Sequence, residues 1–202
     1  MNIVVFISGR GSNLKALLKD QNGYQVTHVI SDKRGIKGFD VAKQFGIPHS
    51  YINWKERPKA EAIATEILTE EQPDLIVLAG FMKVLSANFV EKFHHQIINI
   101  HPSLLPDYPG LNTHQRVLND RKTEHGASVH FVDNQLDHGQ IISQTRIAVE
   151  THDTAESLAT KLILKEHKLL VQTVGQIANK YLFWRDNTLF YIDKPLQKPL
   201  VY

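Results

Sequence analysis

The sequence predicts an α/β fold built on an open, mostly parallel, twisted sheet with helices on both faces. Short continuous apolar runs alternate with helix-like segments through the first half of the chain, as in parallel strands that are covered on both sides. The 202 residues are 42% hydrophobic, which is enough to form the core of one domain. No internal repeat or low-complexity linker interrupts them. We therefore expect a single domain over residues 1–202, with one half at 1–100 and the other at 101–202.

The elements of the first half follow one another in a regular order. The expected strands are residues 3–8, 26–31, 50–52, 75–78 and 97–100. The expected helices are residues 13–20, 38–45, 58–71 and 86–93. Gly46 and Pro48 close the second helix, because glycine favours the position after a helix and proline cannot continue it.

In the second half, the sequence predicts one long helix and strands that make the sheet mixed, with both parallel and antiparallel pairs. The expected elements are a helix at 113–120, longer and partly exposed strands at 127–132 and 141–149, and a helix at 154–181. Spacings of four and seven mark one apolar face of that last helix, formed by Leu158, Leu162, Leu169, Leu170, Val174 and Ile177. Gly175 could end or bend the helix. Aromatic residues on both sides of an Asp-Asn pair predict a terminal hairpin over residues 183–192.

Composition excludes several classes of protein. The 23 basic and 21 acidic side chains nearly cancel, so we expect no extended surface for nucleic acid. The absence of cysteine excludes disulfides, thiolate metal sites and a cysteine nucleophile. The apolar stretches are far shorter than the roughly 20 residues that span a membrane, and no signal peptide is evident. We therefore expect a cytoplasmic protein that binds no membrane.

The sequence SGRGSN at residues 8–13 lies between the first strand and the first helix. Glycines allow a tight turn, and the N–H groups of a helix N-terminus attract anions. Leu14 replaces the third glycine of a dinucleotide fingerprint, and only Asp32 could supply the acidic residue after the second strand, which disfavours NAD. A smaller phosphate ligand fits better. The alternative is a plain turn in which Ser12 or Asn13 caps the helix.

Asn99 and His101 form the second candidate feature. Residues two apart on a strand project from the same face, and Pro102 ends the strand at the edge where open α/β sheets bind ligands. An amide can stabilise an oxyanion and an imidazole can move a proton, as acyl transfer requires. A structural His–Asn pair is the alternative.

A carboxylate is needed to orient the imidazole, and the loop after the late strand offers both Asp133 and Asp137. Spacing alone does not choose between them. The 11 histidines show no metal-ligand spacing, so we expect no metal site.

Five segments, taken together, resemble one family of enzymes. They are residues 8–13, 78–82, 99–106 with 108–110, 125–130 and 136–137. In this order they are similar to the phosphoribosylglycinamide formyltransferases, folate-dependent enzymes of purine synthesis with a Rossmann-like fold. The resemblance covers nearly the whole chain. One departure is His138, where the family often has glycine.

The resemblance implies a role for particular residues. The implied catalytic residues are Asn99, His101 and Asp137. Those implied to bind the substrate glycinamide ribonucleotide (GAR) are Gly11, Ser12, Asn13, Ile163, Leu164, Lys165 and Glu166. Those implied to bind the folate are Arg57, Met82, Lys83, Val84, Leu85, Asn99, Asp133, Asn134, Gln135, Leu136 and Asp137.

The implied reaction moves the formyl group of 10-formyltetrahydrofolate to the amine of GAR, giving formyl-GAR and tetrahydrofolate without a metal. Asn99 and a protonated His101 would stabilise the tetrahedral oxygen, and the charge of Asp137 would favour the imidazolium. The alternatives are a formyltetrahydrofolate hydrolase and a non-catalytic sensor of a phosphate ligand. We expect a monomer or a homodimer.

Overall fold

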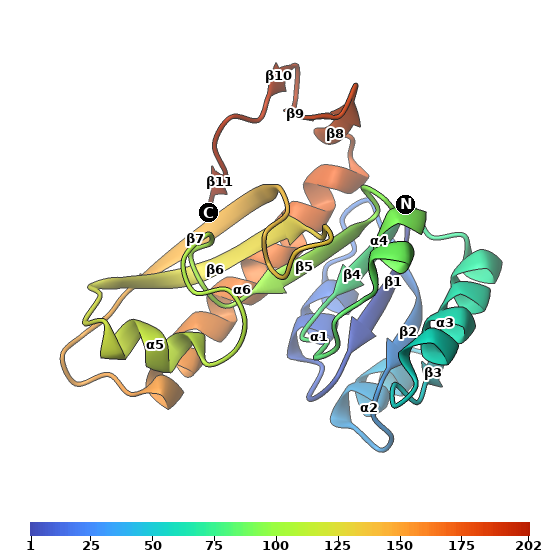
Figure 1. The fold of residues 1–202 in the computed structure, drawn as a ribbon, viewed down its shortest axis with the longest axis horizontal. Helices are drawn as coiled ribbons and strands as arrows, with labels where there is room; N and C mark the ends of the chain where they lie inside the picture. Colours follow the sequence, from blue (N-terminus) through green and yellow to red (C-terminus); the bar gives the residue numbers. More distant parts are fainter. The chain divides into compact units, whose positions relative to one another are not determined.

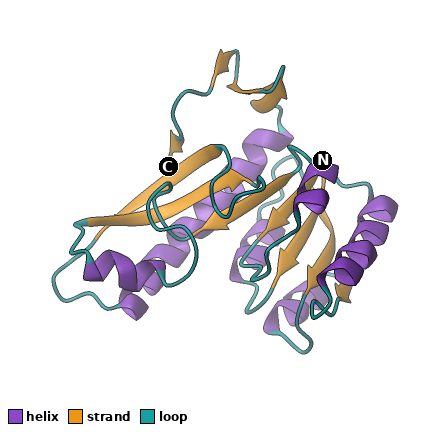
Figure 2. Cartoon of the chain, viewed as in Figure 1, coloured by secondary structure: helices purple, strands orange, loops and turns teal.

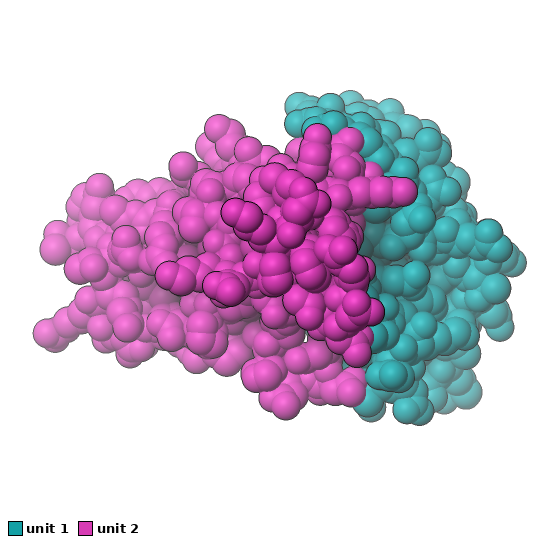
Figure 3. All heavy atoms as spheres, turned by 90° about the horizontal axis from the view of Figure 1, so that it is seen from above, with its two compact units in different colours: residues 1–99 teal, residues 100–202 magenta.

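The computed structural model divides into two units, residues 1–99 and 100–202 (Figure 3). Four parallel strands and the first part of a fifth form the centre of the first unit. The structure describes all residues from 1 to 202. The strands are β1 (Asn2–Ile7), β2 (Gln25–Ser31), β3 (His49–Tyr51), β4 (Leu75–Leu78) and β5 (Ile97–His101). They lie in the order β3-β2-β1-β4-β5, each parallel to its neighbours. The predicted parallel sheet is confirmed.

Four helices connect these strands: α1 (Ser12–Lys19), α2 (Lys37–Gln44), α3 (Arg57–Glu71) and α4 (Ala87–Lys92). From β1 the chain adds β2 and then β3 on one side, and it then crosses back to add β4 and β5 on the other side of β1. The direction of the crossover connections between parallel strands therefore reverses between β1 and β4. Because such crossovers are right-handed, α1 and α2 cover one face of the strands and α3 and α4 the other (Figure 1). A reversal of this kind leaves a crevice at the carboxyl ends of the two strands, where open α/β sheets bind ligands.

Burial explains why the central strands read as continuous apolar runs. Every residue from Ile3 to Ile7 in β1 is fully buried, and all four residues of β4 are buried. A strand covered on both faces has no solvent side, so its sequence shows no alternation.

The second unit contains the antiparallel pair β6 (Glu124–Phe131) and β7 (Ile141–Ala148), with the long helix α6 (Ala155–Ala178) packed on both. Helix α5 (Thr113–Asn119) precedes β6. The tail forms β8 (Leu182–Arg185), β9 (Thr188–Tyr191), β10 (Lys194–Pro195) and β11 (Leu200–Val201) (Figure 2). Strands β8 to β10 make a small antiparallel sheet, and β11 pairs in parallel with β7.

The expected mixed strands, long helix and terminal hairpin are confirmed. Asp186 and Asn187 both adopt positive φ angles in the hairpin turn, as tight two-residue turns require. One expectation is wrong: strand β6 is buried along all but its first residue, since α6 packs against it. Helix α6 does not end at Gly175, whose carbonyl accepts the N–H of Asn179. No helix combines the length and apolar character needed to cross a membrane.

Candidate active site

The turn between β1 and α1 ends in a glycine N-cap. Gly11 is the N-cap of α1 in a left-handed conformation, with φ of 73°, and no side chain caps the helix. The interpretation in which Ser12 or Asn13 caps α1 is therefore wrong, because both already lie inside the helix. A glycine N-cap has no side chain to accept from the first turn of the helix, and the N–H groups at a helix N-terminus attract anions.

The segment after β4 is fixed to the same turn. The Met82 N–H donates to Ser8 Oγ at 2.8 Å, and the Ser8 N–H donates to the Gly80 carbonyl at 3.2 Å. Phe81 packs edge-on against Phe6, with ring centroids 5.3 Å apart. This anchoring places the backbone of the predicted folate segment beside the predicted phosphate turn, within the first unit.

The side chains of that folate segment differ in exposure. Leu85 is buried, whereas Met82 and Val84 are 59% and 60% exposed. Lys83 extends toward the buried Asp32 carboxylate, with Nζ 3.7 Å from Oδ2. Arg57 is the exposed first residue of α3. Apolar side chains held in the open by an anchored backbone are suited to contact a flat, partly apolar ligand.

His101 ends β5 two residues after Asn99 and is 6% exposed. Its Nε2 lies 2.9 Å from the Tyr108 carbonyl oxygen, and its Nδ1 lies 3.4 Å from Asp137 Oδ2. Both ring nitrogens therefore face oxygens that only accept hydrogen bonds. The geometry by itself favours a proton on each nitrogen, that is, the charged imidazolium.

Asp137 lies in the loop between β6 and β7, in a left-handed conformation with φ of 52°. The Gly110 N–H donates to Oδ2 at 2.8 Å, and the other carboxylate oxygen lies 3.6 Å from His130 Nε2. The Nδ1 of His130 lies 2.8 Å from the Phe131 carbonyl oxygen. One buried carboxylate thus contacts two buried histidines in the second unit.

Burial and charge act in opposite directions on these groups. Burial lowers the pKa of His101 below its ordinary value, although the Tyr108 carbonyl and the Asp137 charge act to raise it. The expected effect of Asp137 on the pKa of His101 has the predicted sign but is outweighed. Burial raises the pKa of Asp137, but the hydrogen bonds from His130 and Gly110 and the charge of His101 leave it below its ordinary value. The carboxylate is therefore ionised at neutral pH.

The two aspartates of the loop have different surroundings. Asp133 Oδ1 accepts the Gln135 N–H, and its Oδ2 lies 3.2 Å from His138 Nδ1 on the surface. His138, the departure from the family pattern, therefore has a local partner. Leu136 is 59% exposed, and Asn134 lies beside it in the same loop. Of the two candidates, only Asp137 contacts His101.

The predicted substrate segment of α6 presents mixed surfaces. Leu164 is 68% exposed and Lys165 is exposed, whereas Ile163 is half-buried and Glu166 is buried. Thr154 starts this helix with a capping box, in which its side chain accepts the Ser157 N–H.

The predicted site residues are distributed over both units. The first unit carries Arg57 and residues 11–13 and 82–85, and the second carries residues 133–137 and 163–166. Sequence reasoning missed Ser8, Gly110 and His130 as partners of predicted site residues. A signal for His130 existed, since it stands at the end of a predicted strand just before the loop that carries both aspartates.

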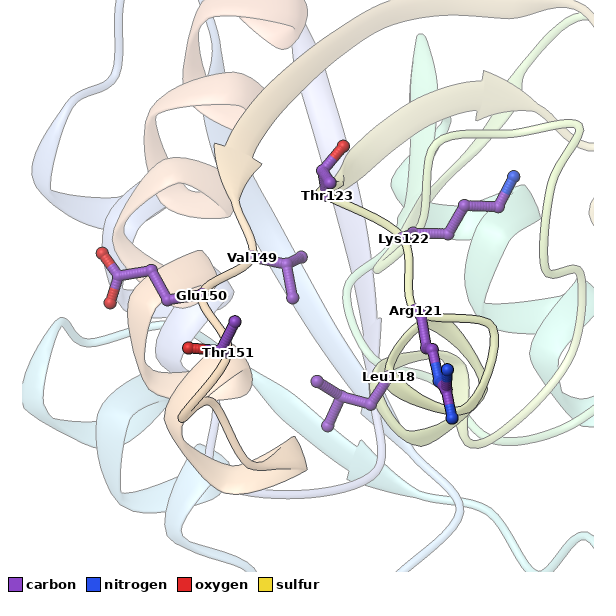
Figure 4. A pocket seen from close by; sticks show the side chains of 7 residues that line it. All are labelled: Leu118, Arg121, Lys122, Thr123, Val149, Glu150 and Thr151. Carbon is purple, nitrogen blue, oxygen red and sulfur yellow. The ribbon is translucent and has the colours of Figure 1, made fainter.

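A separate cavity of about 290 Å³ lies in the second unit, lined by Leu118, Arg121, Lys122, Thr123, Val149, Glu150 and Thr151 (Figure 4). Thr123 precedes β6 and Val149 follows β7, whereas the loop with Asp137 joins the other ends of these two strands. Figure 4 shows Leu118, Val149 and Thr151 facing the same space, with Lys122 extending away from it. This cavity therefore lies at the opposite end of the β6–β7 pair from the loop that carries Asp137.

The sequence is similar to one protein family and to several known proteins. Residues 1–174 match the family described as formyl transferase. The phosphoribosylglycinamide formyltransferase of Escherichia coli (strain K12) is 38% identical over 93% of this chain and 92% of its own length. The trifunctional purine biosynthetic protein adenosine-3 of Bos taurus is 40% identical over 88% of this chain, which spans only 18% of that protein.

Solved structures agree with these relatives. The phosphoribosylglycinamide formyltransferase from Coxiella burnetii superimposes with a TM-score of 0.94 at 38% identity, covering 100% of this chain and 99% of its own. A formyltetrahydrofolate deformylase from Pseudomonas syringae pv. tomato, 24% identical, shares the fold with a TM-score of 0.87. The chain therefore belongs to the formyl transferase family, among the phosphoribosylglycinamide formyltransferases.

Proposed function

We propose that the protein transfers the formyl group of 10-formyltetrahydrofolate to the amine of GAR, in the synthesis of purines. The proposal depends on one contact, which the buried Asp137 carboxylate makes with the ring of His101. His101 itself lies two residues after Asn99 on β5. A carboxylate, an imidazole and an amide are the groups that direct acyl transfer uses. The relatives in E. coli and C. burnetii are named for this activity.

The phosphate of GAR would bind at the N-terminus of α1, on the backbone N–H groups of residues 11–13. The glycine N-cap of α1 supports this placement, because Gly11 carries no side chain that would occupy the space at the start of the helix. Residues 163–166 of α6 would contact the rest of the substrate. Glu166 would accept a hydrogen bond from its amine, and the burial of this carboxylate supports a paired role.

The folate would bind against residues 82–85 and 133–137, with Arg57 near its acidic end. The exposed apolar side chains of Met82, Val84 and Leu136 support a flat ring system as the ligand. The proposed reaction assigns its steps to amide, imidazole and carboxylate groups and none to a metal.

The reaction would begin when the neutral amine attacks the formyl carbon. The carbonyl oxygen becomes negatively charged, and the Asn99 amide and the His101 ring stabilise it. Because burial lowers the pKa of His101, we expect a largely neutral ring before attack and proton uptake as the negative charge develops.

The protons would balance within the site. A water held by Asp137 passes the excess proton of the attacking amine to His101, and His101 delivers that proton to the folate nitrogen as the C–N bond breaks. The products are formyl-GAR and tetrahydrofolate, with no covalent enzyme intermediate.

One assay tests the proposal. Loss of the formyl group from 10-formyltetrahydrofolate is followed spectroscopically with and without GAR. Loss that depends on GAR supports the transferase. Loss without GAR would instead indicate a hydrolase, and no loss in either case would indicate a sensor. We propose the cytoplasm as the place of this activity and a monomer or homodimer as the active form.

A further inference from the structure

Gly38, the second residue of α2, lies against the turn that we propose to bind phosphate. It is buried, and its N–H donates to the Gly9 carbonyl at 3.1 Å. Helices α1 and α2 pack together, so the first turn of α2 is held beside Gly9 and Gly11. This contact joins two segments that are far apart in the sequence.

The approach is possible only because Gly38 has no side chain. A Cβ atom at this position would overlap Ile7 Cδ1 and would lie 3.0 Å from the Gly9 carbonyl oxygen. It would also lie 3.5 Å from the Gly11 Cα atom. Conversely, a Cβ atom on Gly11 would lie 2.7 Å from the Gly38 Cα atom. The two glycines face each other backbone to backbone.

We infer that Gly38 is a positioning residue for the phosphate-binding turn, and so determines how tightly the phosphate of the substrate is held. The Gly9 carbonyl belongs to the peptide that precedes the turn, and the hydrogen bond from Gly38 fixes its orientation. Hydrogen bonds to an anion need donor–acceptor distances of about 2.7–3.2 Å, so shifts of a few tenths of an ångström in this peptide weaken them. This inference rests on the proposed function, because it assumes that the turn binds phosphate.

The test is the variant Gly38→Ala, measured by the calorimetric binding of ribose 5-phosphate and by steady-state kinetics. Loss of one well-placed hydrogen bond typically weakens binding by roughly 3- to 10-fold. We therefore expect binding of ribose 5-phosphate to weaken, and the KM for GAR to rise, by that factor. The KM for the folate and kcat should stay unchanged, because the neighbours of Gly38 are Ile7, Gly9 and Gly11 and not residues 82–85.

A second variant separates positioning from core packing. Ile7→Val removes the Cδ1 atom that the new methyl group would overlap, so Ile7→Val/Gly38→Ala should recover thermal stability relative to Gly38→Ala alone. The contact with the Gly9 carbonyl remains, so binding of ribose 5-phosphate should stay weak. Ile7→Val alone and the exposed α2 variant Lys43→Ala serve as controls with normal binding.

Three results would overturn the inference. They are normal binding of ribose 5-phosphate by Gly38→Ala, full recovery of binding in the double variant, and failure of the unaltered protein to bind ribose 5-phosphate. Failure of the proposed function gives a different result: the unaltered protein would bind ribose 5-phosphate, and Gly38→Ala would weaken that binding, but no formyl group would reach GAR.

Discussion

Replacing Asp137 by Asn tests whether this carboxylate controls the charge of His101. The backbone of Asp137 has a φ of 52°, a conformation that asparagine adopts more readily than most residues, so Asp137→Asn should fold without added strain. The amide oxygen can still accept the Gly110 N–H, which Asp137 accepts at 2.8 Å. The substitution therefore removes the charge and leaves the shape.

The expected loss of rate follows from the distance between the two groups. His101 Nδ1 lies 3.4 Å from Asp137 Oδ2. At an effective dielectric constant of about 20, two unit charges at this separation interact by about 5 kcal/mol. If half of that stabilises the transition state, its loss costs about 2.5 kcal/mol, which corresponds to roughly 10²-fold in kcat.

The pH dependence gives the second readout. The Asp137 charge raises the pKa of His101, so Asp137→Asn lowers that pKa further and moves the His101 limb of the kcat profile to lower pH. The assay is steady-state formyl transfer from pH 5 to 9 at saturating substrates, with the exposed Asp193→Asn as the matched control. Turnover within about 3-fold of the unaltered protein, with an unchanged pH profile, would refute the assigned role.

Three further predictions concern Asn99, Ser8 and the buried His125. For Asn99→Ala we expect a loss of at least about 10²-fold in kcat with an unchanged unfolding temperature, because one oxyanion donor is removed; near-normal kcat would contradict this. Ser8→Ala removes the hydroxyl that accepts the Met82 N–H, so the KM for the folate should rise by roughly 3- to 10-fold while the KM for GAR stays unchanged. Equal changes in both KM values would argue against a role of this hydrogen bond in folate binding. Burial lowers the pKa of His125 to about 4. The unfolded state therefore binds more protons below about pH 6.5, and stability should fall as the pH drops from there toward 4, by up to about 1.4 kcal/mol per pH unit. Thermal unfolding across that range checks this, and a flat unfolding temperature would refute it.

The sequence was a good guide wherever one local rule decided the structure. Continuous apolar runs predicted β1 and β4, and the Asp186-Asn187 pair predicted the hairpin turn, because burial on both faces and positive φ angles leave clear signals. Strands β10 and β11 have two residues each, which is too short for any periodicity to appear. The burial of β6 was missed for another reason, since it depends on where α6 packs.

In the candidate site, too, the features set by a local rule were predictable and those that depend on the folded loop were not. The position of Asn99 and His101 at a strand end followed from the alternation of side chains and from Pro102. The choice of Asp137 over Asp133 depends on a loop conformation with a positive φ angle, which aspartate adopts only at a minority of positions. Spacing could not reveal this choice, because both residues lie in the same short loop.

The arrangement around Asp137 explains how a buried site could take up a proton and release it again. His101 and His130 each direct one nitrogen toward the Asp137 carboxylate and the other toward a backbone carbonyl, of Tyr108 and Phe131 respectively. A neutral His101 ring carries only one N–H group, so one of its two nitrogens faces an acceptor without donating a hydrogen. One added proton improves the hydrogen bonding, while burial of its charge costs free energy. Because these effects oppose each other, His101 holds the added proton weakly. Weak binding of the proton is what a general acid needs if it is to deliver that proton to a leaving nitrogen within one turnover.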